Sequence, residues 1–151
     1  MLKAGDCAPA FELPDQDGKA VTLDGLLAQG ELILYFYPAD FTPVCTREAC
    51  EFRDRFEDLA AVQVQIVGVS PQSAKSHQQF RSSFSLPFPL LCDEGKTVID
   101  AFGVNGPLGF GVRRATYLIG VDRTIRSRVV ADIFLGSHMD LIRQVIAERS
   151  P

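Results

Sequence analysis

Two cysteines five positions apart are the residues of this chain best suited to chemistry. Cys45 and Cys50 lie in the run YFYPADFTPVCTREAC, residues 35–50. A helix is expected to begin after the proline that ends the apolar part of this run, because Thr42 suits an N-cap and Pro43 suits the first helical position. Cys45 then lies in the first turn, at the positive end of the helix dipole. This position favours the thiolate, the nucleophilic form of cysteine, and so predicts a reactive thiol with a potential partner.

These residues resemble the active-site motif of the peroxiredoxins, Pro-x-x-x-Thr/Ser-x-x-Cys, which reads here Pro38-x-x-x-Thr42-x-x-Cys45. The extension CTREAC, residues 45–50, is similar to the subgroup called bacterioferritin comigratory protein, or PrxQ. Three more segments resemble that family's N-terminal hairpin, its late acidic loop and the strand with its second catalytic residue, an arginine: 5–19, 88–94 and 114–119. The resemblance therefore covers most of the chain. It implies a single thioredoxin-like peroxiredoxin domain over residues 1–151.

The resemblance also implies a function, that of a thiol-dependent peroxidase acting on hydrogen peroxide and small organic hydroperoxides. The Cys45 thiolate would attack the terminal peroxide oxygen, release water or alcohol and become a sulfenic acid. Cys50 would then attack the sulfenic acid to form a disulfide. An external dithiol protein of thioredoxin type would reduce that disulfide. No haem, flavin or metal is implied.

Three further residues are expected to assist Cys45. Thr42 can direct its hydroxyl toward the sulfur or the peroxide as well as cap the helix, and the backbone N–H groups of the first turn add fixed dipoles. The family pattern places a permanent cation at Arg114, which can stabilise both the thiolate and the departing oxygen. Pro38 ends the strand and, in the family, screens the thiolate from water. The predicted catalytic set is therefore Cys45, Cys50, Thr42, Arg114 and Pro38.

Two adjacent arginines compete for the place beside Cys45. Arg113 and Arg114 point to opposite faces of a strand, so only one of them can reach the sulfur. Counting along the strand does not settle which, and the resemblance over residues 116–119 favours Arg114. Glu48 follows Cys45 by three residues and shares its side of the helix. Either it orients the arginine or it lies on the exposed face.

Geometry limits how Cys50 can act. In an intact helix, Cα atoms five residues apart are separated by roughly 8.7 Å, whereas a disulfide needs about 4.4–6.8 Å. We therefore expect the first turns of this helix to unwind in each catalytic cycle. Two alternatives stay open. Cys45 works alone with an outside thiol that resolves the sulfenic acid, or the chain is a redox-sensing or chaperone module that turns over little peroxide.

The other cysteines and the two histidines have weaker claims to a role. Cys7 is expected in an N-terminal loop and Cys92 in a loop after two leucines; both are interpreted as incidental thiols, with Cys92 an outside candidate for resolution. His77 and His138 have no recognisable partner and are interpreted as solvent-facing or structural. The chain has no Cys-x-x-Cys pair, which argues against a zinc site and against a thiol–disulfide oxidoreductase.

Hydrophobic patterns predict the elements that position these residues. Alternating apolar positions around Asp15–Gly18 predict a hairpin, and the continuous apolar run 32–37 predicts a central strand buried on both faces. Apolar residues at spacings of three and four predict a helix over 43–60 with Cys45 facing inward. The pattern further predicts strands over 62–69, near 90–91, over 112–119 and over 124–130, and helices over 73–84, 97–102 and 139–148. This order is typical of a thioredoxin-like α/β fold with a mixed sheet.

The longest irregular stretch is the glycine-rich segment 103–112. It does not join a strand to a helix as a phosphate-binding loop does, so a nucleotide site is rejected. Leu108 and Phe110 within it either line a substrate pocket or belong to a mobile segment.

Composition limits the choice of partners. A net charge of −4 without a basic face argues against nucleic acid. No apolar stretch approaches the roughly 20 residues of a membrane span, and the first residues lack the apolar core of a secretion signal. We therefore expect a reducing compartment, the bacterial cytoplasm, and a monomer or weak homodimer.

Overall fold

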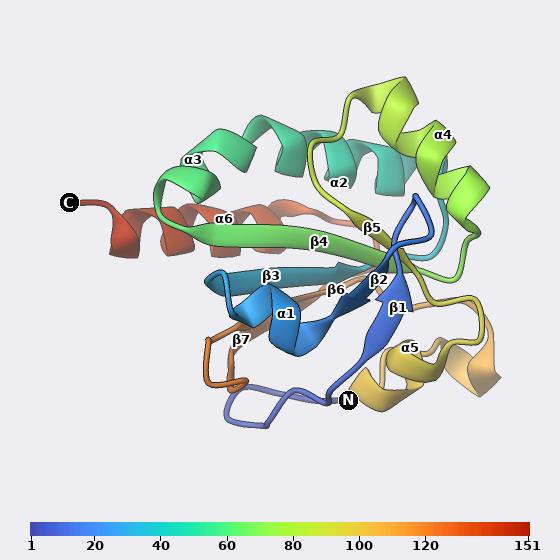
Figure 1. Ribbon diagram of the computed structural model, residues 1–151, viewed down its shortest axis with the longest axis horizontal. Coiled ribbons are helices and arrows are strands. Elements are labelled where there is room, and N and C mark those ends of the chain that lie inside the picture. Colours follow the sequence, from blue (N-terminus) through green and yellow to red (C-terminus); the bar gives the residue numbers. More distant parts are fainter.

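A mixed five-stranded sheet forms the centre of the computed structural model, which describes residues 1–151 (Figure 1). Its strand order is β5-β4-β3-β6-β7. Strand β3 pairs in parallel with β4 and antiparallel with β6, so it is the central strand. A separate hairpin pairs β1 with β2. The strands are β1 (Glu12–Pro14), β2 (Ala20–Thr22), β3 (Glu31–Phe36), β4 (Val64–Ser70), β5 (Leu90–Cys92), β6 (Ala115–Ile119) and β7 (Ile125–Val130).

Helices cover both faces of the sheet (Figure 1). One face carries α2 (Pro43–Asp54), α3 (Phe56–Ala61), α4 (Ala74–Phe84) and α6 (Gly136–Arg149); the other carries the hairpin, α1 (Leu23–Leu27) and α5 (Thr97–Phe102). Because side chains alternate along a strand, Ile33 and Tyr35 of β3 join the first core, whereas Leu34 and Phe36 join the second. The central strand buried on both faces is thus confirmed. None of the helices combines the length and the apolar character needed to cross a bilayer.

The helix predicted over 43–60 is wrong in one respect, because it divides at Arg55. There the backbone N–H bonds to the carbonyl of Phe52, three residues back, and the chain restarts as α3 at Phe56. Phe52 and Leu59 nevertheless belong to the same core. The apolar stripe continues across the break, so the spacing of apolar residues could not reveal it.

One short helix was not predicted from the sequence, and the predicted position of Cys92 needs correction. The chain after β2 forms the short helix α1, capped by Thr22, whose hydroxyl oxygen accepts from the N–H of Gly25 at 3.0 Å. Cys92 does not lie in a loop. It is the last residue of β5, where it pairs with Ser70 of β4 and is buried, because this pairing extends the edge strand by one residue.

The glycine-rich segment between α5 and β6 contains one short 3₁₀ turn, Pro107–Gly109. The ammonium group of Lys96 donates to the side chain of Asn105 at 3.2 Å and to the carbonyls of Gly109 and Gly111 at 3.1 and 3.0 Å. One cation therefore ties the two ends of this segment together.

Candidate active site around Cys45

Cys45 lies in the first turn of α2, immediately after the loop that leaves β3. Its side chain is buried against the core beneath α2, as the sequence predicts, with 2% of the residue exposed. Pro43 occupies the first turn, and the first backbone bond runs from the N–H of Thr46 to the carbonyl of Thr42 at 2.8 Å. The first N–H groups of a helix have no partner within it. They are therefore available to an anion or a polar ligand at the cysteine.

Arg114 brings a positive charge to this sulfur. Its Nη2 donates to Sγ of Cys45 at 3.2 Å, and its side chain is 4% exposed. The residue directly precedes β6, which pairs with β3, and this pairing brings the arginine to the end of β3 where α2 begins. Arg114 thus gives the sulfur a charged, buried hydrogen-bond donor.

Glu48 occupies the other side of the same guanidinium. Its Oε1 accepts from Nη1 of Arg114 at 2.7 Å, and the side chain is fully buried. The sequence left open whether Glu48 orients the arginine or lies on the exposed face of the helix. The structure places it beside the arginine. Burial raises the pKa of Glu48 to about 7, against a smaller lowering effect of Arg114. Its second oxygen, Oε2, has no hydrogen-bond partner.

Asp132 fixes the backbone and side chain of Arg114 from the loop after β7. The carbonyl of Asp132 accepts from Nε of Arg114 at 3.0 Å, and its carboxylate accepts from the Arg114 N–H at 3.0 Å. The same carboxylate pairs with Nε of Arg113, which points outward and is 39% exposed. The two arginines point apart as expected, although both precede β6 and do not lie on the strand. Arg114 is the one that contacts sulfur. Nothing in the sequence marks Asp132, because its loop has no motif.

The side chain of Thr42 makes a different hydrogen bond from the one expected of an N-cap. It occupies the N-cap position with extended backbone angles, but its hydroxyl donates to the carbonyl of Ala39 at 2.9 Å. It accepts no hydrogen bond from the helix, so the predicted side-chain cap is absent. In this arrangement the Thr42 hydroxyl closes the preceding turn through its bond to Ala39.

Pro38 borders a surface hollow beside this turn. Phe110, Arg113 and Asp132 line the same hollow. Phe110 is largely exposed, and Leu108, which is not part of the lining, is almost fully exposed. Of the two apolar residues considered in the glycine-rich segment, only Phe110 therefore faces this hollow.

All four cysteines are free thiols, so the structure is that of the reduced protein. Cys50 is half-buried on α2, which runs unbroken from Pro43 to Asp54 and therefore holds the two candidate cysteines apart. Cys92 is buried on β5, and burial raises the pKa of its thiol to about 11. Cys7 is exposed in the N-terminal loop, where its backbone bridges to Thr124. Cys92 thus lacks the cationic environment of a reactive thiol. Sγ of Cys7 donates to the carbonyl of Ala8 at 3.8 Å and has no side-chain hydrogen-bond partner.

A buried network holds the loop between β3 and α2. The carboxylate of Asp40 accepts from the hydroxyl of Tyr37 and from that of Ser76, each at 2.7 Å. Nδ1 of His77 lies 2.7 Å from the same carboxylate, and its Nε2 lies 2.9 Å from the carbonyl of Leu91. The network joins this loop to α4 and β5. His77 is thus structural, not solvent-facing, and its partner Asp40 had no recognisable signal in the sequence.

His138 of α6 is also structural and fully buried. Its Nε2 lies 2.9 Å from the carbonyl of Ala131 and its Nδ1 lies 2.7 Å from the hydroxyl of Thr116. Burial lowers the pKa of His138, so the neutral ring donates from Nε2 and accepts from the hydroxyl at Nδ1. Its Nδ1 is 4.0 Å from Oε2 of Glu48.

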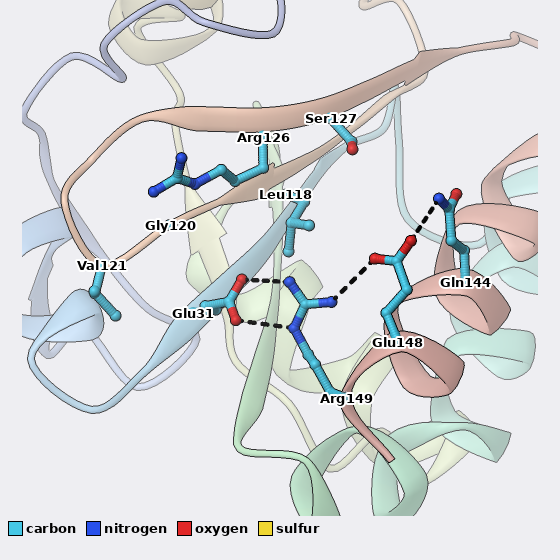
Figure 2. A pocket seen from close by; sticks show the side chains of 9 residues that line it. All are labelled: Glu31, Leu118, Gly120, Val121, Arg126, Ser127, Gln144, Glu148 and Arg149. Carbon is cyan, nitrogen blue, oxygen red and sulfur yellow. Dashed lines mark hydrogen bonds and ion pairs between the residues drawn. The ribbon is translucent and has the colours of Figure 1, made fainter. Parts of the chain in front are cut away.

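A second pocket, at the opposite end of β3, has no such chemistry (Figure 2). Arg149 binds both carboxylate oxygens of Glu31 at 2.9 and 2.8 Å, and Glu148 lies beside it. Figure 2 shows these charged groups directed at one another, and Gln144 donates to Glu148 at 2.9 Å. No cysteine or histidine lines the pocket.

Comparisons of sequence and of structure with known proteins all find peroxiredoxins. The profile of the AhpC/TSA family matches residues 4–128. The putative peroxiredoxin Bcp of Coxiella burnetii is 41% identical over 130 residues, which are 82% of this chain and 85% of that protein. The crystal structure of peroxidoxin BcpB from Mycobacterium tuberculosis matches with a TM-score of 0.92 at 36% identity and covers 100% of both chains. The bacterioferritin comigratory protein of Xanthomonas campestris, studied for alkyl peroxide reduction, matches with a TM-score of 0.84 at 26% identity, covering 93% of this chain and 92% of that one.

Proposed function

Because this chain belongs to the AhpC/TSA family, and within it to the Bcp and PrxQ peroxiredoxins, we propose that Cys45 reduces hydrogen peroxide and small organic hydroperoxides. The predictions of family, of enzyme class and of a thioredoxin-like fold are confirmed. The catalytic residues, the resolving step and the reductant are proposals. We further propose that residues 1–151 form one catalytic domain.

The observation that carries this function is the hydrogen bond of 3.2 Å from Arg114 to the sulfur of Cys45 at a helix N-terminus. In the first step the thiolate attacks the terminal oxygen of the peroxide. A sulfur–oxygen bond forms, the oxygen–oxygen bond breaks, and the departing oxygen leaves as alkoxide or hydroxide and takes up a proton. The N–H groups of Arg114 and of the first turn can stabilise the charge that moves onto that oxygen.

Pro38 and Thr42 have supporting roles in this proposal. Pro38 borders a surface hollow that Arg113 and Asp132 also line, and we propose that its ring screens the sulfur of Cys45 from water. Thr42 holds the turn before α2 through its bond to Ala39. In the structure described, its hydroxyl acts on the backbone of the site.

The second step joins Cys45 to Cys50. The Cys50 thiolate attacks the sulfenic sulfur, the disulfide bond forms, and the oxygen leaves as water after taking up a proton. Because α2 is intact and an ideal helix separates the two Cα atoms by roughly 8.7 Å, the first turns of α2 must unwind for this bond to form. A dithiol protein of thioredoxin type then reduces the disulfide, and both thiols return. This cycle draws its electrons from thiols and needs no cofactor.

Steady-state peroxide consumption tests this function. With a thioredoxin system as reductant, the chain should consume hydrogen peroxide, and the Cys45→Ser variant should fall to the uncatalysed background. Cys7→Ser is the matched control, since Cys7 is exposed and distant from α2 in the fold, and it should retain the activity. Equal rates for the Cys45→Ser variant and the unchanged chain would contradict the proposal, and little consumption by the unchanged chain would favour the redox-sensing alternative.

A further inference from the structure

The guanidinium of Arg114 hydrogen-bonds to two acidic groups, the thiol of Cys45 and the carboxyl group of Glu48. Arg114 donates to Sγ of Cys45 through Nη2 and to Oε1 of Glu48 through Nη1. The carboxyl group of Glu48 is fully buried, and its Oε2 meets no donor. A buried carboxylate whose oxygens are not both satisfied is unfavourable, because it has lost its water without full replacement. Two negative charges on one cation are therefore disfavoured here.

The groups that surround Glu48 do not supply a second cation. His138 of α6 is neutral, with both ring nitrogens engaged, and burial lowers its pKa. Tyr35 of β3 has a buried hydroxyl without a partner, and burial raises its pKa well above the ordinary value. Glu51, one turn further along α2, adds a like charge that raises the pKa of Glu48, in the same direction as burial. Around neutral pH this environment favours one negative charge beside Arg114.

We propose that Glu48 stores the proton for peroxide reduction: it is a carboxylic acid while Cys45 is a thiolate, and a carboxylate once Cys45 is a sulfenic acid. This role depends on the proposed function of Cys45. The sulfur loses its charge when it bonds to oxygen, and Glu48 then becomes the only anion beside Arg114. The negative charge passes from one side of the guanidinium to the other.

The step balances without an outside proton. The Cys45 thiolate, the Glu48 carboxylic acid and one peroxide give a sulfenic acid, a Glu48 carboxylate and one water or alcohol. The sulfur is oxidised, the peroxide is reduced, and the proton lost by Glu48 balances the one gained by the departing oxygen. After the disulfide has been reduced, the Cys45 thiol loses its proton and Glu48 regains one, so the reduced site is restored.

The number of protons taken from solution tests this role. The full chain with Cys50→Ser stops at the sulfenic acid, and a pH indicator in weak buffer near neutrality measures the uptake for each Cys45 that gains an oxygen by mass spectrometry. We expect almost no uptake from this variant and one proton per sulfenic acid when Glu48→Gln is added. Equal uptake in the two proteins would overturn the proposal while leaving the peroxidase function intact. Absence of added oxygen at Cys45 would overturn both.

Infrared difference spectroscopy gives a second readout that needs no change at Glu48, in case the Glu48→Gln protein does not fold. The Cys50→Ser chain is prepared with ¹³C-labelled and with unlabelled glutamate, and spectra are recorded before and after one equivalent of hydrogen peroxide. We expect the carbonyl stretch of one protonated, isotope-sensitive carboxylic acid to disappear on oxidation. Persistence of that band, or its absence from the reduced protein, would overturn the proposal.

Discussion

The guanidinium of Arg114 donates a hydrogen bond to the sulfur of Cys45 across 3.2 Å, although the two residues are 69 positions apart in the chain. The pairing of β6 with β3 creates this contact, since it carries Arg114 to the end of β3 from which the chain enters α2. The same cation can stabilise negative charge on sulfur and on the oxygen that leaves.

Replacing this arginine should slow the peroxide step. Arg114→Lys keeps a positive charge but cannot donate to Cys45 and Glu48 with the geometry of a planar guanidinium. We expect kcat/KM for hydrogen peroxide to fall about 10²-fold, the scale of removing one donor from a site of developing charge. Stopped-flow oxidation of the reduced protein measures this value.

Arg113→Lys is the matched control for that experiment. Arg113 pairs with Asp132 at the surface and does not contact the sulfur. Its replacement keeps a positive charge at the surface and should leave the rate almost unchanged. A larger loss from Arg113→Lys than from Arg114→Lys would mean that the wrong arginine has been assigned.

Cys50→Ser should separate the two steps of the cycle. The first oxidation of Cys45 should keep its rate, whereas turnover with a thioredoxin-type reductant should fall close to background, because no disulfide forms for the reductant to attack. Cys92→Ser should leave turnover unchanged, since a buried thiol whose pKa is raised to about 11 is a poor nucleophile. Full turnover by the Cys50→Ser protein would instead support resolution by an external thiol.

His77 should contribute strongly to stability. In His77→Leu the Asp40 carboxylate and the carbonyl of Leu91 remain buried without their imidazole partner. We expect a loss of about 3–5 kcal/mol, as when one partner of a buried pair is removed. Ser76→Ala, which deletes one bond to the same carboxylate, should lose only about 1 kcal/mol. Urea denaturation measures the free energy of unfolding of both variants. Equal losses would show that the buried pair of His77 and Asp40 is not the main contribution of this network to stability.

The raised pKa of Glu48 predicts a pH dependence of stability. The folded protein keeps the Glu48 proton up to about pH 7, whereas the unfolded chain loses it near the ordinary value of 4.5. The folded state therefore binds more protons between these values, and its stability should fall as pH rises through this window, by about 3 kcal/mol in total.

Comparison with Glu48→Gln isolates this contribution. The free energy of unfolding of the variant, minus that of the unchanged chain, should increase between pH 4.5 and 7. Other groups, including His138 with its lowered pKa, act in both proteins and cancel in the difference. A difference that stays constant with pH would show that Glu48 titrates normally in the folded protein.

Local sequence was sufficient for the elements that hold Cys45. A continuous apolar run specified the central strand, and Thr42 with Pro43 specified where the helix begins. These signals succeed because strand burial and helix initiation depend on neighbours in the chain. The division of the helix at Arg55 carried no such signal, because the apolar stripe is the same on both sides.

Contacts made by distant segments could not be predicted in the same way. Asp132 and His138 reach the site from a loop and a helix after the last strand, and only tertiary packing brings them there. In the sequence Asp40 cannot be told from an ordinary turn residue, because its partner His77 lies on α4, 37 positions further along the chain. The position of Glu48 was left open because helical periodicity identifies one side of a helix but not what covers that side.

Disulfide mapping after one equivalent of hydrogen peroxide tests the central claim most directly. Trypsin cuts after Arg47, between the two cysteines of α2, so a bond between them appears as two linked peptides in mass spectrometry. The account predicts a linkage between Cys45 and Cys50, with Cys7 and Cys92 still free. Oxidation confined to another cysteine, or an unmodified Cys45, would contradict it.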